Sequence, residues 1–282
     1  MSEIQTENVD FINAENYITN HNFMSYSRLS RFIQCEAAVA AGYSEPSSVA
    51  QLVGSYVDAY FSNELNDFKL AHPEIINSRT GELKSDFKKA DDIIKRIKND
   101  ETFSYFMSGE KQKIMTGKIA GMKFKIKIDS YLPGKFIVDL KVMKDFTRVW
   151  SDIFGRYTNF IEAYNYDLEL AIFQEIVFQN TGEKLPCYIA AITKEEPSDL
   201  GIFEIPQNKL DEALEIVKHN IPRIEAVLSG KEAPNRCEKC NYCRSTKRAR
   251  VLNWDLVGAS GDKLREEGIE SNDPMLVIKE EK

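Results

Sequence analysis

Two kinds of hydrophobic periodicity divide the chain, with helical spacing dominant before residue 110 and alternation after it. Helical spacing predicts helices from Ser27 to Cys35, with Ser25 or Ser27 as the cap, from Ser47 to about Asn63, and from Asp86 to about Met107. The stretch from Asn66 to Lys84 contains a proline and an Asn-Ser-Arg-Thr-Gly turn, which predicts a surface loop.

The second pattern predicts strands that alternate with helices. Apolar and polar positions alternate over Lys111–Ala120 and Met122–Ser130 on either side of Gly121, which favours a hairpin. The further expected elements are strands over Lys135–Val142, Leu185–Thr193 and Gly201–Ile205, and helices over Asn159–Asn180 and Asn208–Leu228. This order predicts an α/β fold with a central mixed sheet flanked by helices.

Composition indicates an ordinary globular protein. Of the 282 residues, 43% are hydrophobic and 29% are charged. An apolar run of about 18 residues is absent from the sequence, and Met1–Asn13 has no apolar signal-peptide region, so we expect a cytoplasmic protein without a membrane span. We expect a loose leader over residues 1–23 and a charged tail over residues 251–282.

The distribution of charge matters more than its sum. A net charge of −7 by itself argues mildly against a nucleic-acid partner. Between Glu110 and Lys141, however, eight lysines face three acids, and Arg244, Lys247, Arg248 and Arg250 form a second basic run. These local excesses are compatible with phosphate binding.

Two adjacent strands carry the candidate chemistry. In the strand over Lys135–Val142, Asp139 and Lys141 share one face, and Asp129 lies on the polar face of the preceding strand. If the two strands pair across the Tyr131–Gly134 turn, the two carboxylates converge, which suits Mg²⁺ or Mn²⁺. Lys141 would orient or deprotonate a water, or neutralise charge on the phosphate. The alternative is a pair of strands with solvated charges.

These residues resemble a known nuclease motif. Ile-Asp129, eight residues, and then Val-Asp139-Leu-Lys141 is similar to the PD-(D/E)xK pattern. The segments that narrow the resemblance are QLVGSYVDAYF (51–61), KIKIDSYLPGKFIVDLKV (125–142), YNYDLELAIFQEIV (164–177) and CEKCNYCRSTK (237–247). Together they resemble the RecE-like, exodeoxyribonuclease VIII type of phage and prophage nucleases, over a domain of about residues 24–250.

The resemblance implies a restriction-endonuclease-like core and a Mg²⁺-dependent, ATP-independent exonuclease that digests linear double-stranded DNA from its ends. Such enzymes usually act 5′ to 3′ and leave a single strand for recombination. Asp129 and Asp139 would be metal ligands and Lys141 the catalytic lysine. The resemblance also implies a single-strand annealing protein as partner and a homo-oligomer.

Two positions depart from the family pattern. Glu169 and Phe173 stand where a Gln-x-x-x-Tyr is usual, and Gln174 lies about 140° from Glu169 around the helix, so it is no obvious substitute. Glu169 points inward, either into the active site or as a satisfied structural residue. Asp58 stands where relatives often have His, either as a third metal ligand or as an exposed helix charge.

The cysteines predict a second metal site. Cys237, Cys240 and Cys243 are spaced by three residues, and a run of this kind is more typical of iron–sulfur proteins than of zinc fingers. Cys187 lies in an apolar strand and is expected in the core. The resemblance implies that Cys35 joins the other three around a [4Fe–4S] cluster, with Zn²⁺ as the alternative and no metal as the third reading.

Three functions are compatible with the sequence. The favoured one is the exonuclease. The others are a structure-specific endonuclease of the same fold and a non-catalytic DNA-binding recombination subunit. The sequence contains no Gly-x-x-x-x-Gly-Lys-Ser/Thr motif, so we do not expect ATP-driven unwinding.

Overall fold

The computed structural model describes residues 12–151, 155–248 and 254–256. The chain divides into two compact units, one formed by Met1–Phe23 and Ser47–Leu214 and the other by Met24–Pro46 and Glu215–Lys282. Among the described residues, no helix combines the length and the apolarity needed to cross a membrane. The predicted tail lies outside the described residues, apart from the short 3-10 helix η2 (Trp254–Leu256).

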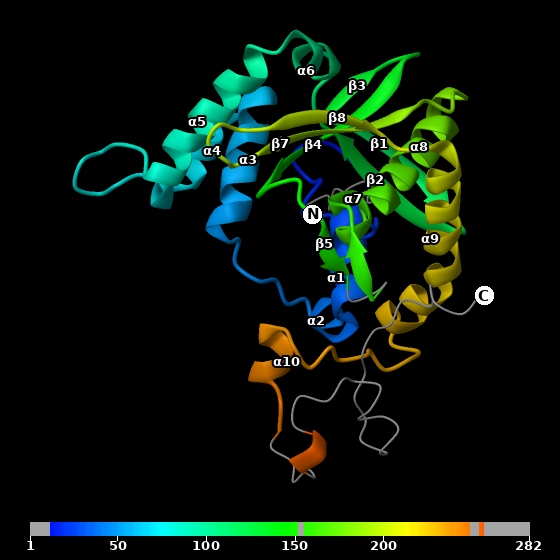
Figure 1. Cartoon of the computed structure of the whole chain (residues 1–282). Helices are drawn as coiled ribbons and strands as arrows, with labels where there is room; N and C mark the ends of the chain where they lie inside the picture. Colours follow the sequence, from blue (N-terminus) through cyan, green and yellow to red (C-terminus); the bar gives the residue numbers. More distant parts are fainter. Residues whose placement is uncertain (1–11, 152–154, 249–253, 257–282) are drawn as a thin grey trace, which may run out of the picture. The chain divides into compact units, whose positions relative to one another are not determined.

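A mixed four-stranded sheet forms the centre of the first unit (Figure 1). Its order is β3 (Ser130–Leu132), β4 (Phe136–Met143), β7 (Cys187–Thr193) and β8 (Leu200–Glu204). Strands β4 and β7 run parallel, and the other two pairs are antiparallel. The predicted hairpin is formed by β1 (Lys113–Ile119) and β2 (Met122–Ile128). The α/β prediction with a central mixed sheet is confirmed.

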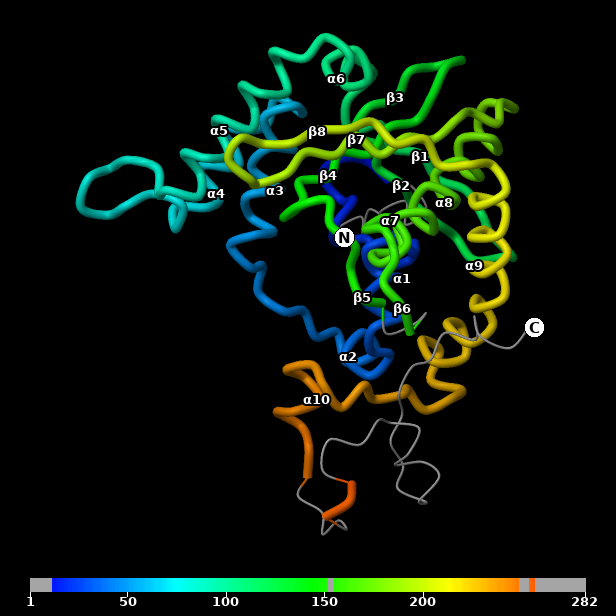
Figure 2. The backbone as a smooth tube through the Cα atoms, viewed as in Figure 1, coloured from blue at the N-terminus to red at the C-terminus, as the bar shows by residue number. Residues whose placement is uncertain are grey.

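Helices complete the first unit. They are α3 (Val49–Phe61), α4 (Leu65–Ala71), the 3-10 helix η1 (Pro73–Ile75), α5 (Ser85–Lys98), α6 (Glu101–Phe106), α7 (Phe160–Ala163) and α8 (Tyr166–Thr181). A short hairpin of β5 (Val149–Ser151) and β6 (Arg156–Thr158), which the sequence pattern did not predict, lies between β4 and α7 (Figure 2).

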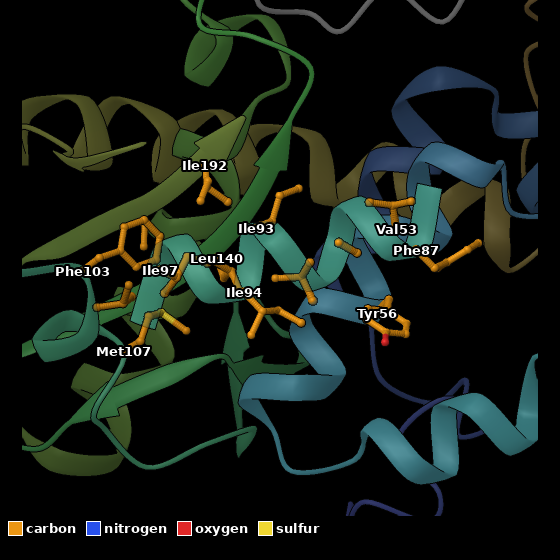
Figure 3. Packing of buried hydrophobic residues seen from close by; sticks show 14 of the residues in the cluster. Val53, Tyr56, Phe87, Ile93, Ile94, Ile97, Phe103, Met107, Leu140 and Ile192 are labelled. Atoms are coloured by element: carbon orange, nitrogen blue, oxygen red, sulfur yellow. The ribbon is translucent and has the colours of Figure 1, made fainter. Parts of the chain in front are cut away.

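Alternation along β4 separates the core from the candidate site. Phe136, Val138 and Leu140 join a buried cluster with residues of α3, α5 and α6 (Figure 3). Helices α3 and α5 pack side by side in this layer (Figure 1). Asp139 and Lys141 occupy the alternate positions of β4, and Lys141 contacts α8. One face of the strand therefore stabilises the fold, while the other carries the polar residues.

The structure corrects one expected loop and two expected helices. The loop expected over residues 66–84 contains α4 and η1. The helix expected over residues 86–107 breaks because Asp100 caps a new helix by accepting the N–H of Phe103 at 2.8 Å. The helix expected over residues 159–180 breaks at Asn165, whose φ of 56° is left-handed. A side-chain cap at Asp100 and a left-handed residue at Asn165 therefore overrode the helical periodicity at these two places.

The second unit joins early and late parts of the chain. It contains α1 (Tyr26–Gln34), α2 (Glu36–Ala40), the later turns of α9 (Gln207–Leu228) and α10 (Asn241–Ser245). The buried carboxylate of Glu36 accepts hydrogen bonds from Arg223 Nη2 at 2.6 Å and from the Asn235 N–H at 2.7 Å. These charge-assisted bonds connect α2 to the C-terminal segment.

Candidate active site

The three residues of the strand motif converge as predicted. Ser130 of β3 pairs with Val138 of β4, so Asp129 and Asp139 lie at the same level of the two strands. The Leu140 N–H donates to Asp129 Oδ2 at 2.8 Å, which fixes that carboxylate against β4. Lys141 Nζ lies 2.6 Å from Asp139 Oδ2. Both Asp139 and Lys141 are largely shielded from solvent, with side-chain exposures of 5% and 18%.

Helix α8 supplies Glu169 to the same place. Lys141 Nζ donates to Glu169 Oε2 at 2.9 Å, and the Glu169 side chain is 13% exposed. Tyr166, one turn earlier, places its ring centroid 4.6 Å from Lys141 Nζ. The sequence pattern did not single out Tyr166, although its spacing of three residues from Glu169 puts both on one helix face.

Asp58 reaches the site from α3, and Gln112 connects it to Asp129. Gln112 Nε2 lies 3.1 Å from Asp58 Oδ1 and 3.3 Å from Asp129 Oδ1. The amide thus donates between two carboxylates, while its own Oε1 is buried and accepts no hydrogen bond. Sequence reasoning missed Gln112, because its role depends on contacts with residues 54 and 17 positions away.

Burial and like charge perturb this group of carboxylates. Burial raises the pKa of Asp129 well above its usual range, and Asp58 and Asp139 raise it further. Burial also raises the pKa of Asp58, with Lys127 opposing and Asp139 adding to the shift. The pKa of Glu169 rises to about 7, first through burial and then through Asp139. Burial and the neighbouring carboxylates thus both make the ionised forms of these groups less favourable.

Lys141 remains a cation in this setting. Burial alone would lower its pKa, but the carboxylates of Asp139 and Glu169 outweigh burial and raise the pKa well above the usual value. A lysine held in this way donates hydrogen bonds and positive charge rather than accepting a proton.

The donor set fits a hard divalent cation. Carboxylate oxygens come from Asp58, Asp129 and Asp139, and the Gln112 amide nitrogen holds the first two of these carboxylates together. Asp139 Oδ2 accepts no hydrogen bond, because its contact with Lys141 has the distance of an ion pair but not hydrogen-bond geometry. A buried carboxylate oxygen that accepts no hydrogen bond, beside two further carboxylates, is a ligand of the kind that Mg²⁺ or Mn²⁺ prefers.

Two of the predicted basic positions serve the fold instead of a surface. Lys125 is 4% exposed and donates to the carbonyl oxygens of Tyr17 and Asn20. Lys111 donates to the Met107 carbonyl oxygen. Strand alternation puts Lys125 on the polar face of β2, but Tyr17 and Asn20 of the expected leader cover it there. The basic excess available for phosphate is correspondingly smaller.

The four predicted cysteines of the second unit come together. The Sγ atoms of Cys35, Cys237, Cys240 and Cys243 all lie within 4.8 Å of one another. Cys35 Sγ is 3.5 Å and Cys237 Sγ is 3.8 Å from Cys243 Sγ. Cys187 is fully buried, as expected of a core residue. The geometry of the four thiols suits a metal ion.

The fold and the motif define a nuclease-type domain of the PD-(D/E)xK superfamily, whose members usually use divalent metals. Residues 25–246 match the PDDEXK-like domain of unknown function (DUF3799), and the chain belongs to this family. No curated protein matches the chain.

Two solved structures were compared with the chain. The crystal structure of a protein named "Putative exonuclease" from Eubacterium rectale is 42% identical, with a TM-score of 0.83, covering 89% of this chain and 99% of that one. The crystal structure of SSO0001 is 10% identical, with a TM-score of 0.31, covering 80% of this chain and 96% of that one. This similarity is too low to support a conclusion about fold or function.

Proposed function

We propose that this protein is a divalent-metal-dependent exonuclease that digests linear double-stranded DNA without ATP. The observation that carries the proposal is the meeting of four charged side chains: Asp139 and Lys141 from β4, Glu169 from α8, and Asp129 from the residue between β2 and β3. The PDDEXK-like family and the likeness to an exonuclease-named structure at 42% identity support it.

The residues divide the work of hydrolysing a phosphodiester. Asp58, Asp129 and Asp139 would hold the cation, whose chemistry there would be to bind the scissile phosphate and to lower the pKa of the attacking water. Lys141 donates positive charge toward the phosphate oxygens. Glu169, with its pKa near 7, is our candidate acceptor for the proton of the water. Water oxygen bonds to phosphorus as the bond to the leaving nucleotide oxygen breaks.

Linear and circular DNA distinguish this proposal from its alternatives. Purified protein with Mg²⁺ is given end-labelled linear duplex, carrying the label at the 5′ or the 3′ end, and a covalently closed plasmid. Degradation of the linear DNA alone supports the exonuclease, and the two labels give its polarity. Nicking of circles would indicate the endonuclease. Binding without cleavage, with the Asp139→Ala variant indistinguishable from wild type, would indicate the non-catalytic subunit.

We further propose that the four cysteines hold a structural metal in the second unit. The sequence favours [4Fe–4S], in which each thiolate binds a different iron and the thiolates therefore lie far apart. Sulfurs 3.5 and 3.8 Å apart instead suit one tetrahedral ion with Zn–S bonds of about 2.3 Å. This geometry favours Zn²⁺. Anaerobic purification followed by iron, sulfide and zinc analysis decides, and Cys35→Ser should lose whichever metal is found.

The recombination role and the partners remain predictions from the resemblance. An annealing protein would bind the single strand that digestion exposes. A pull-down with and without residues 251–282 tests whether the predicted tail takes part. Light scattering tests the predicted homo-oligomer.

A further inference from the structure

Exposed aromatic side chains gather in the segment that joins the strand of Lys141 to the helix of Glu169. Trp150, Tyr157 and Tyr164 are 52%, 60% and 46% exposed. Large hydrophobic side chains are costly to expose, and a local concentration of them marks a binding surface.

The hairpin β5–β6 presents two of these rings as a pair. Trp150 and Tyr157 are directly opposite each other across the strands. Their ring centroids are 5.4 Å apart with planes at 76°, an edge-to-face contact. This contact restricts the orientations of both rings. About half of each side chain is still exposed, so a further planar group can stack on it.

Buried contacts anchor the hairpin to the unit. Ser151 and Thr158 are 5% and 1% exposed, and the Thr158 hydroxyl donates to Glu162. Phe146, just before the hairpin, stacks on Phe160 of α7 at 5.5 Å between centroids. The aromatic pair is thus displayed on a fixed base, which reduces the entropy cost of binding.

Aromatic contacts lead from α7 to the catalytic lysine. The Phe160 ring lies 6.5 Å from that of Tyr166, and the Tyr164 ring lies 5.8 Å from Tyr166. Tyr166 covers Lys141 at 4.6 Å. A series of ring contacts therefore runs from the start of the hairpin segment to the candidate active site.

Basic side chains accompany the exposed rings. Lys144 and Arg156 have side-chain exposures of 92% and 58%, and Arg148 is also exposed. Lys144 lies 3.5 Å from Asp145 Oδ2 and Arg156 lies 3.6 Å from Glu162 Oε2, and surface ion pairs of this kind are weak enough for a phosphate to compete with them. Rings that stack on bases, set among cations that meet phosphates, are the composition of a single-strand binding platform. In the chain segment between β4 and α8, both of which carry residues of the proposed nuclease site, this mixture favours a nucleic-acid strand over a protein partner or a lipid surface.

We propose that the hairpin aromatic pair, Trp150 and Tyr157, stacks on unpaired bases of the DNA strand at the end being digested. The proposal rests on the proposed nuclease function and assigns it a substrate feature, which is an end carrying a single-stranded tail. The cations Lys144, Arg148 and Arg156 bind the backbone of that tail.

Binding without cleavage tests the proposal directly. The probe is a duplex with a thymidine tail of about ten nucleotides, measured in EDTA against the blunt duplex. The chain has two tryptophans, so in a Trp254→Phe background the fluorescence of Trp150 reports stacking. We expect the tailed probe to quench it. Trp150→Ala with Tyr157→Ala should weaken tailed-duplex binding by about tenfold or more and leave blunt-duplex binding within about twofold.

Controls separate stacking from damage. Phe178→Ala removes another exposed aromatic ring and should leave both affinities unchanged. Trp150→Phe with Tyr157→Phe keeps the rings and should preserve tail binding, and Trp150→Leu keeps apolar bulk without an aromatic face and should not. Circular dichroism confirms that each variant is folded.

Different failures have different meanings. If wild type binds no DNA and degrades none, both the proposed function and this inference are wrong. If wild type is active while a folded double alanine variant binds the tail equally well, or loses self-association instead, only this inference is overturned.

Discussion

Asp129→Asn should make the protein more stable than wild type in the absence of metal and less stable than wild type when metal is bound. Asp58 Oδ1 and Asp129 Oδ1 lie 3.1 and 3.3 Å from one nitrogen, so the two oxygens are no more than about 6.4 Å apart. Two charges at this distance repel by about 2.5 kcal/mol at an effective dielectric constant of about 20.

Without metal, the variant gains more free energy from the relief of carboxylate repulsion than it loses from a weaker hydrogen bond. An Asn oxygen still accepts the Leu140 N–H, but the bond is no longer charge-assisted, at a cost of about 1 kcal/mol. The metal-free variant should therefore be more stable than wild type by roughly 1–2 kcal/mol, or about 3–6 °C in Tm. A cation at about 100 times its Kd would stabilise wild type by about 2.7 kcal/mol and the variant much less.

Thermal unfolding in EDTA and in excess Mg²⁺, both at pH 8, measures the reversal. Asp92→Asn is the matched control, since this exposed carboxylate pairs with Lys95 on the surface of α5 and should respond equally in both buffers. If Asp129→Asn is the less stable protein even in EDTA, Asp129 is a favourably paired structural residue and the electrostatic argument for a metal site fails.

Three further outcomes are expected. Lys141→Met should lower DNA hydrolysis by about 10²–10³-fold or more while duplex binding, measured by gel shift, changes little, and a variant with wild-type turnover would exclude Lys141 from catalysis. Gln112→Ala should weaken Mn²⁺ binding, measured by calorimetry, by about tenfold, whereas Gln179→Ala, which removes contacts with β1, should not. Burial, followed by the charge of Glu162, raises the pKa of Asp167 to about 6. Because the folded carboxyl holds its proton more tightly than the unfolded one, stability should fall as the pH rises from about 4 to 7. Asp167→Asn should make that slope shallower, since Glu169 still contributes to it, and should add on the order of 2 kcal/mol at pH 8. An unchanged slope in urea titrations would reject this assignment.

Local sequence predicted the parts of the site that depend on local geometry. Strand alternation put Asp139 and Lys141 on one face, and a short turn was enough to bring Asp129 opposite them. Glu169 was placed inward by helical spacing, although its partner Lys141 lies 28 residues earlier. Each of these predictions needed only one element or one turn.

The remaining parts depend on packing between distant segments. Gln112 acquires its role because α3 and the β1–β2 hairpin present Asp58 and Asp129 to one amide. Lys125 sits on a strand face that alternation marks as polar, but carbonyl groups of Tyr17 and Asn20 cover it. Neither set of contacts has a periodic signature along the chain, because Gln112 lies 54 positions from Asp58 and 17 from Asp129, and Lys125 lies 108 positions from Tyr17.

The discontinuous second unit has a consequence for synthesis. Its α1 and α2 leave the ribosome long before the segment that completes them, since Glu36 binds Arg223 and Asn235. At about 5–20 residues per second, the roughly 170 intervening residues take on the order of 10–30 s. The first unit becomes complete near the end of that interval, when β7 and β8 have been made, and until Arg223 follows the early helices lack their anchor. A nascent chain stalled before Arg223 should therefore display α1 and α2 to proteases, even when the nuclease core is already compact.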